Sequence, residues 1–109
     1  MKIYRIGNIE VMDHDLPSQT QNEVSYFTAW EAMASAEYMD FWRIPTPNEM
    51  RYLINLSMEY QVLNIHYKRP YWTSHYVHDN STAYTIFGNS INITSMYNLY
   101  PVRFVRDLR

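Results

Sequence analysis

Alternating hydrophobic and polar residues predict strands near both ends of the chain. Between residues 2 and 12 the alternation indicates one strand, or two short strands separated at Gly7-Asn8. Residues 13–22 are polar and indicate a loop. In the second half, short apolar segments predict further strands at residues 71–74, 83–87, 91–94 and 102–106. Turn residues at 78–81 and 88–90 separate the first three of these strands.

Helical spacing appears first after residue 28. Thr28 and Glu31 have the spacing of a capping box, in which each side chain accepts a hydrogen bond from the backbone N–H of the other residue. Behind this signal the apolar side chains recur at helical intervals, on Ala29, Ala32, Met33 and Ala36. We expect a helix that ends near Met39-Asp40 and packs close to a sheet through its alanines.

A second helix begins at Pro47. Thr46 and Glu49 form another capping-box pattern, and proline is well suited to the first helical position because its missing N–H is not needed there. The predicted buried face is formed by Met50, Leu53, Ile54 and Ser57, and the helix should end between residues 58 and 60. Residues 61–69 are irregular. Early helices followed by short strands predict one α+β domain over residues 1–109.

Composition excludes several classes of function. The chain contains 109 residues with a net charge of −2, which gives no general attraction to nucleic acid or anionic membranes. It has no cysteine, so disulfides, zinc–thiolate sites and thiol nucleophiles are excluded. The N-terminus lacks a signal-peptide pattern, and no apolar run reaches membrane-spanning length. We therefore expect a cytoplasmic protein or a component of a particle such as a virion.

A series of motifs spans nearly the whole chain, at residues 6–12, 15–17, 31–32, 42–46 with 49–50, 71–74, 83 with 87–88, and 102–106. In this order they resemble the motifs of one family, the bacterial and phage DUF1566 domain. The most specific is Trp42-Arg43-Ile44-Pro45-Thr46 with Glu49 downstream. The glycine that the family commonly has before this tryptophan is missing, and Met39-Asp40-Phe41 stands there.

The resemblance implies a C-type-lectin-like fold, in which two helices flank a looped antiparallel sheet and the N- and C-terminal strands pair. It also implies a binding or display role on cell surfaces or phage particles. The related formylglycine-generating enzymes act through cysteines, which this chain lacks. We therefore do not expect that activity here.

Candidate catalytic and metal-binding residues favour a structural interpretation. We expect Trp42 to lie in the core and Arg43 to pair with a carboxylate or cap carbonyl groups. His75 and His78 could bind a metal only with a third ligand such as His66 or His14, and otherwise are loop histidines. Too few oxygen ligands converge for calcium, and no nucleophile with an oriented base is evident. We expect no cofactor, no metal and no enzymatic activity.

Aromatic and amide side chains in the late loops predict a contact surface. Residues 67–76 interleave basic and aromatic side chains, a pattern on which nucleic acid can stack, but the acidic net charge argues against that partner. Tyr, Asn, Ser and His are typical of adaptable protein recognition. The predicted binding residues are Tyr67, His75, Tyr76, His78, Asn80, Tyr97, Asn98 and Tyr100.

These features lead to two hypotheses about function. The first is a non-catalytic recognition or assembly domain, of a phage or a bacterium, that binds another protein or a second copy of itself. The second is a calcium-independent module that binds carbohydrate or a receptor. An exposed apolar patch would favour the first hypothesis, and a concave aromatic pocket with amides would favour the second.

Overall fold

The computed structural model describes residues 2–15, 26–37, 39, 41–61, 63–65, 68–77 and 81–108. Within these ranges the chain forms two helices and six strands. They are β1 (Ile3–Ile6), β2 (Ile9–Met12), α1 (Ala29–Glu37), α2 (Pro47–Tyr60), β3 (Tyr71–Tyr76), β4 (Thr82–Phe87), β5 (Ser90–Ser95) and β6 (Val105–Asp107). The predicted α+β class is therefore confirmed. Most of the predicted loop at 13–22 and of the turn at 78–81 lies outside the described residues.

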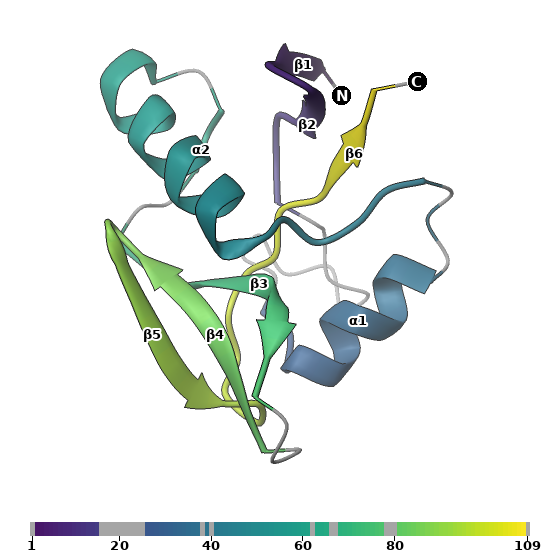
Figure 1. The fold of residues 1–109 in the computed structure, drawn as a ribbon, viewed down its shortest axis with the longest axis vertical. Coiled ribbons are helices and arrows are strands. Elements are labelled where there is room, and N and C mark those ends of the chain that lie inside the picture. Colours follow the sequence, from purple (N-terminus) through teal and green to yellow (C-terminus); the bar gives the residue numbers. More distant parts are fainter. Residues whose placement is uncertain are drawn as a thin grey trace.

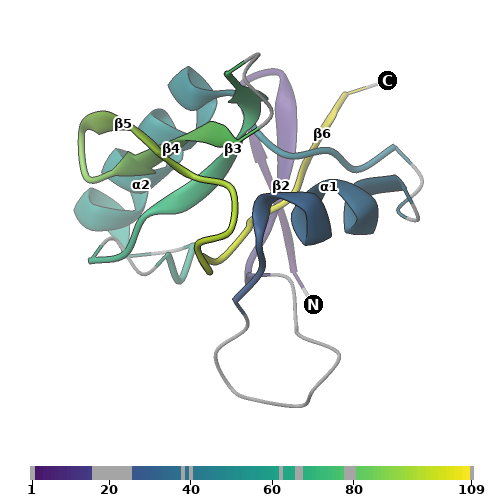
Figure 2. The ribbon, with the colours of Figure 1, turned by 90° about the horizontal axis from the view of Figure 1, so that it is seen from below.

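The strands form two antiparallel sheets of three strands each, rather than one looped sheet. One has the order β1-β2-β6 and the other has the order β3-β4-β5. In Figure 2, α2 and the second sheet occupy one half of the molecule, and α1 and the first sheet occupy the other. Since β2 pairs with β6, an N-terminal strand pairs with the C-terminal one, as predicted, and both chain ends lie on one side of the molecule (Figure 1).

Local signals placed the helices correctly. At α2, the Thr46 N–H donates to Glu49 Oε1 at 2.8 Å and the Glu49 N–H donates to Thr46 Oγ1 at 3.2 Å. The same reciprocal pair forms between Thr28 and Glu31 at α1. Pro47 is the first residue of α2, and the predicted face of this helix is buried: Met50, Leu53, Ile54 and Ser57. The predicted end of α1 was wrong by about two residues, since the helix ends at Glu37.

Two groups of buried side chains form the core. One lies between α2 and both sheets and includes Leu53, Ile54, Tyr71 and Ile86. The other surrounds α1 and includes Ala32, Trp72, Met96 and Phe104. Because Ala29 and Ala32 have small side chains, α1 lies directly against Trp72 and Met96, as the alanine-rich face predicted.

The C-terminal strand is shorter than predicted. The sequence pattern gave a strand over residues 102–106, whereas β6 covers only Val105–Asp107. Val102, Arg103 and Phe104 are all buried and precede the strand as an irregular extended segment. The guanidinium of Arg103 donates to the backbone carbonyl oxygens of Met12 and Leu63, and the Met12 N–H donates to the Phe104 carbonyl oxygen at 3.4 Å. These bonds hold the segment without a regular strand ladder.

Candidate functional site

The predicted binding residues fall into three groups. Tyr67, His78 and Asn80 lie outside the described residues. Tyr97, Asn98 and Tyr100 lie in the loop that follows β5, and His75 and Tyr76 lie at the end of β3.

The loop after β5 is held against the start of α1 by backbone hydrogen bonds. The Ala29 N–H donates to the Met96 carbonyl oxygen at 3.0 Å. Phe27 and Tyr100 exchange two further bonds, of 2.9 and 3.0 Å. Anchored at both ends, the loop presents the side chains of residues 97–99 from a fixed backbone.

Trp30 and Tyr97 form an exposed aromatic pair across this junction. Their ring centroids lie 4.7 Å apart with the ring planes tilted by 59°. Trp30 is 39% exposed and Tyr97 is 71% exposed. Leu99, in the same loop, is also more than half exposed. Sequence reasoning missed Trp30 because it assigned that residue to a helix and looked for contacts only in loops.

Tyr100 supports the loop, and its hydroxyl stays within reach of solvent. Its ring packs edge-on against the buried Trp72 with centroids 5.2 Å apart. The Asn98 Nδ2 donates to the Tyr100 hydroxyl at 3.2 Å, which orients the amide at the surface. Of the two predicted binding residues, Asn98 is therefore the exposed one and Tyr100 is half-buried.

Tyr76 borders a narrow hollow between α1 and β3. Ala32, Met33 and Met96 contribute to its walls, and its volume of about 10 Å³ is room for about one water molecule. This hollow is too small to accept an organic ligand. Tyr76 itself is exposed and adds a further ring near the anchored loop.

His75 lines a larger and more open hollow beside the start of α2. The hollow has a volume of about 380 Å³, and Asn48, Tyr84 and Ile91 also line it. That volume falls in the range of small-ligand sites, which is about 300–1,000 Å³. An imidazole, an amide and a tyrosine ring thus surround one concave surface.

Arg43 is the centre of an ion-pair hub, and it pairs with carboxylates as predicted. Its Nη1 and Nη2 donate to the two carboxylate oxygens of Glu49 at 2.7 and 2.8 Å. Its Nε and Nη2 also donate to Asp107 at 3.2 and 2.9 Å. These hydrogen bonds lower the pKa of Glu49 and of Asp107, and they raise the pKa of Arg43. The hub joins the start of α2 to β6.

Arg103 forms a second, buried hub that sequence reasoning missed. Its side chain has 0% exposure, and it pairs with Asp15 at 2.9 Å. The other oxygen of Asp15 accepts a hydrogen bond from the Tyr71 hydroxyl at 2.8 Å. Arg103 also bonds the carbonyl oxygens of Met12, Leu63 and Asn64, so its donors are satisfied by distant segments.

In the described part of the basic and aromatic run, residues 68–76, two of the aromatic rings are buried. Tyr71 and Trp72 are buried, and the Trp72 Nε1 donates to the Phe27 carbonyl oxygen at 2.6 Å. Trp42 is half-buried rather than fully in the core, with the Arg106 guanidinium 4.5 Å from its ring centroid.

The side chains that could bind a metal are dispersed across the part of the chain that the structure describes. There, no three His, Asp or Glu side chains lie together as a metal site would require. His14, for example, is hydrogen-bonded through Nδ1 to Asp13 at 2.8 Å.

Comparisons with known proteins leave the family resemblance as a prediction. No protein-family model matches the chain, and no curated protein matches it in sequence. Among the described residues, no helix has the length and apolar character required to cross a membrane.

Proposed function

We propose that this chain is a non-catalytic protein-recognition or assembly domain. Its binding surface is the Trp30–Tyr97 pair with Asn98 and Leu99, called here the α1–loop surface. The observation that carries the proposal is the exposure of two aromatic rings that contact each other at a tilted angle, on a backbone that hydrogen bonds already hold in place.

The α1–loop surface should lose little conformational entropy when it binds a partner. Tyrosine and tryptophan provide large contact areas with few rotatable bonds, so they lose little conformational entropy on binding. The bonds at Ala29, Phe27 and Tyr100 fix the loop before a partner arrives, which reduces the ordering cost further. Such rings commonly account for most of the binding energy of protein interfaces.

The arrangement of charges supports a non-catalytic role. One ion-pair hub joins Arg43 to Glu49 and Asp107. A second ion pair joins Asp15 to Arg103. Arg106 pairs with Glu10 at 2.8 Å. These groups hold segments of the fold together, and such pairing is the ordinary structural use of charged residues.

We propose a C-type-lectin-like fold of the DUF1566 type, in a phage or bacterial protein. The pairing of β2 with β6 and the positions of α1 and α2 support this proposal. In a phage, the α1–loop surface would face another virion protein or a host protein. With either partner, the exposed Trp30–Tyr97 pair would form the contact.

A second candidate function is calcium-independent carbohydrate binding at the hollow beside His75. The specific observation in its favour is the meeting of Tyr84, Asn48 and His75 around a concave surface. A sugar could stack on the tyrosine ring and bond the polar groups. A glycan array with the wild type and Tyr84→Ala tests it, because only specific binding would be lost in the variant.

Affinity capture from the native host or particle tests the first candidate. The wild-type chain and Trp30→Ala serve as baits, and Tyr52→Ala is the matched control because Tyr52 is an exposed ring on α2. We expect one protein to be retained by the wild type and the control but depleted by Trp30→Ala. Equal recovery with all three baits would contradict the proposed surface.

A further inference from the structure

The two sheets have four outer edges, and three of them are protected. At β3, the Trp72 N–H donates to the Pro101 carbonyl oxygen at 3.2 Å and the Ser74 N–H donates to the Pro45 carbonyl oxygen at 2.8 Å. At β6, Val105 and Arg43 exchange backbone bonds of 2.7 and 2.9 Å.

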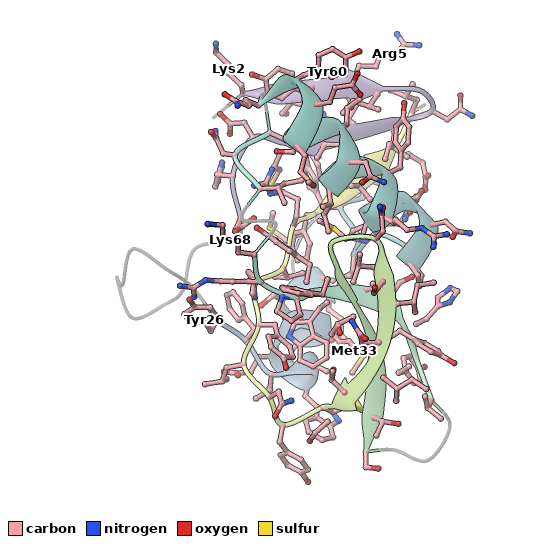
Figure 3. All side chains as sticks on the ribbon, turned by 90° about the vertical axis from the view of Figure 1, so that its left-hand side faces the viewer. Lys2, Arg5, Tyr26, Met33, Tyr60 and Lys68 are labelled. Atoms are coloured by element: carbon pink, nitrogen blue, oxygen red, sulfur yellow. The ribbon has the colours of Figure 1, made fainter. Side chains whose placement is uncertain are left out.

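The outer edge of β1 is protected by charge instead. It carries Arg5 and follows Lys2, and both side chains extend away from the body of the molecule (Figure 3). Charged residues, lysine above all, are a common device that prevents edge strands from pairing with other chains.

The outer edge of β5 has neither kind of protection. Among the described residues, no backbone hydrogen bond joins Ser90–Thr94 to any segment other than β4. No charged residue occurs anywhere from Ser81 to Val102. The β4–β5 hairpin lies at the front of the view in Figure 3, on the outside of the molecule. An edge strand of this kind is a template for another strand.

The exposed side chains of β5 are apolar on one face. Ile91 is 44% exposed and Ile93 is 60% exposed. They are two residues apart on a strand and therefore lie on the same face, where they pair with Ile86 and Tyr84 of β4. Burial of both isoleucines would be favourable in an interface.

We propose that β5 pairs antiparallel with β5 of a second copy of this chain, about a two-fold axis at Asn92. The sequence of the strand is chemically palindromic around that residue: Ser90-Ile91-Asn92-Ile93-Thr94. The axis places Ile91 opposite Ile93 of the second copy, Asn92 opposite Asn92, and Ser90 opposite Thr94. A two-fold interface requires such self-complementarity, because the same patch serves on both subunits.

Pairing at β5 ends the assembly at two subunits. It joins the two β3-β4-β5 sheets into one sheet of six strands whose outer edges are the two copies of β3. Those edges are occupied by the bonds to Pro45 and Pro101. Because no open edge remains on this sheet, the contact closes as a dimer rather than growing into a fibre.

A second copy is a better occupant than a foreign strand for two reasons. The uncharged edge offers no charge pattern that would select a particular foreign sequence. The palindrome, in contrast, matches the strand to itself over the five residues from Ser90 to Thr94, with serine opposite threonine at its two ends. This interface uses none of the α1–loop residues, so its test stands apart from that of the proposed function.

Sedimentation velocity of the purified chain tests the dimer. We expect a concentration-dependent dimer in the wild type, and only monomer for Ile93→Lys up to about 1 mM. Ile3→Lys is the matched control, since Ile3 is 40% exposed on the protected edge strand β1. It should dimerise like the wild type. A monomeric wild type, or an Ile93→Lys variant that still dimerises, would overturn the proposal.

Cross-linking tests the position of the axis without relying on a disruptive change. The chain has no cysteine, so Asn92→Cys introduces the only thiol. Directly opposed residues of paired strands have Cβ atoms about 4.5–5.5 Å apart, close enough for a disulfide after a small adjustment. We expect oxidation to yield covalent dimer from Asn92→Cys and not from Asn48→Cys on α2. Equal yields from both variants would contradict the proposed axis.

Discussion

The carboxylate of Asp15 and the guanidinium of Arg103 lie 2.9 Å apart, with the Arg103 side chain completely buried. Asp15 follows β2, and Arg103 precedes β6. Further bonds from Arg103 reach Leu63 and Asn64, in the segment between α2 and β3. One side chain thus joins three parts of the chain that are distant in sequence.

Asp15→Ala should therefore destabilise the fold strongly. The substitution leaves the buried Arg103 charge without its counter-ion and removes the acceptor of the Tyr71 hydroxyl. Breaking a buried pair in this way costs about 3–5 kcal/mol. Urea denaturation measures the loss, with Arg5→Ala on exposed β1 as a control that should change stability by less than about 0.5 kcal/mol. A similar small change in both variants would show that the pair contributes little.

The two capping boxes allow a matched comparison. Thr46→Ala and Thr28→Ala each remove one cap and should each lower the unfolding free energy by about 1 kcal/mol. Glu49→Ala should cost more than Glu31→Ala, because Glu49 also receives two bonds from Arg43. Equilibrium denaturation should also show that Thr46→Ala and Glu49→Ala are not additive. Strict additivity would contradict a reciprocal pair at α2.

Acid should weaken the fold through the Arg43 hub. Hydrogen bonds from Arg43 lower the pKa of Glu49 and of Asp107 in the folded state, so the unfolded state binds more protons as the pH falls. Their contribution is complete above the unfolded pKa values of about 4.3 and 3.9, and it is lost as the pH drops through the lower folded values. Arg43→Met should flatten this part of the stability–pH curve. If Arg43→Met left the slope of unfolding free energy against pH unchanged between about pH 5 and pH 2, the proposed role of Arg43 would be contradicted.

The helices could be predicted from sequence because their signals are local. Thr46, Pro47 and Glu49 lie within one turn, and the face from Met50 to Ser57 follows from spacing alone. Arg103 could not be placed, because its partners at Met12 and Leu63 are brought to it only by the folded chain. Phe41 adopts a φ of 67°, in the left-handed region that favours glycine.

The candidate site was predictable only in part. The late loop was identified from its rings and amides, and Tyr97 and Asn98 are exposed there. Trp30 was missed because its contact with Tyr97 joins a helix to a distant loop. The segment Ile91-Asn92-Ile93 within a long uncharged stretch can be seen in the sequence. Whether that strand was internal or at an edge depended on the sheet order, which the sequence does not reveal.

Removal of metal ions should leave stability unchanged. The His, Asp and Glu side chains of the described residues form no group of three that could hold a metal. We expect the same melting temperature with and without a strong chelator. A decrease of several degrees in the chelator would contradict a metal-free fold, because a bound metal adds its binding energy to stability.

If the α1–loop surface binds a protein, Tyr97 should contribute strongly to the affinity. Truncation of an interfacial tyrosine at a hot spot commonly costs about 2 kcal/mol or more, which is about a 30-fold loss of affinity. Tyr76→Ala should also weaken binding, since Tyr76 is an exposed ring at the end of β3.

The most direct test is the Kd of the captured partner for the wild type, for Tyr97→Ala and for Tyr60→Ala. Tyr60 is 60% exposed at the end of α2, at the same end of the molecule as Lys2 and Arg5 (Figure 3). The account predicts a Kd about 30-fold higher for Tyr97→Ala and an unchanged Kd for Tyr60→Ala, with both variants folded. An unchanged Kd for Tyr97→Ala, together with weaker binding after Glu37→Ala or Arg51→Ala on the helices, would contradict it.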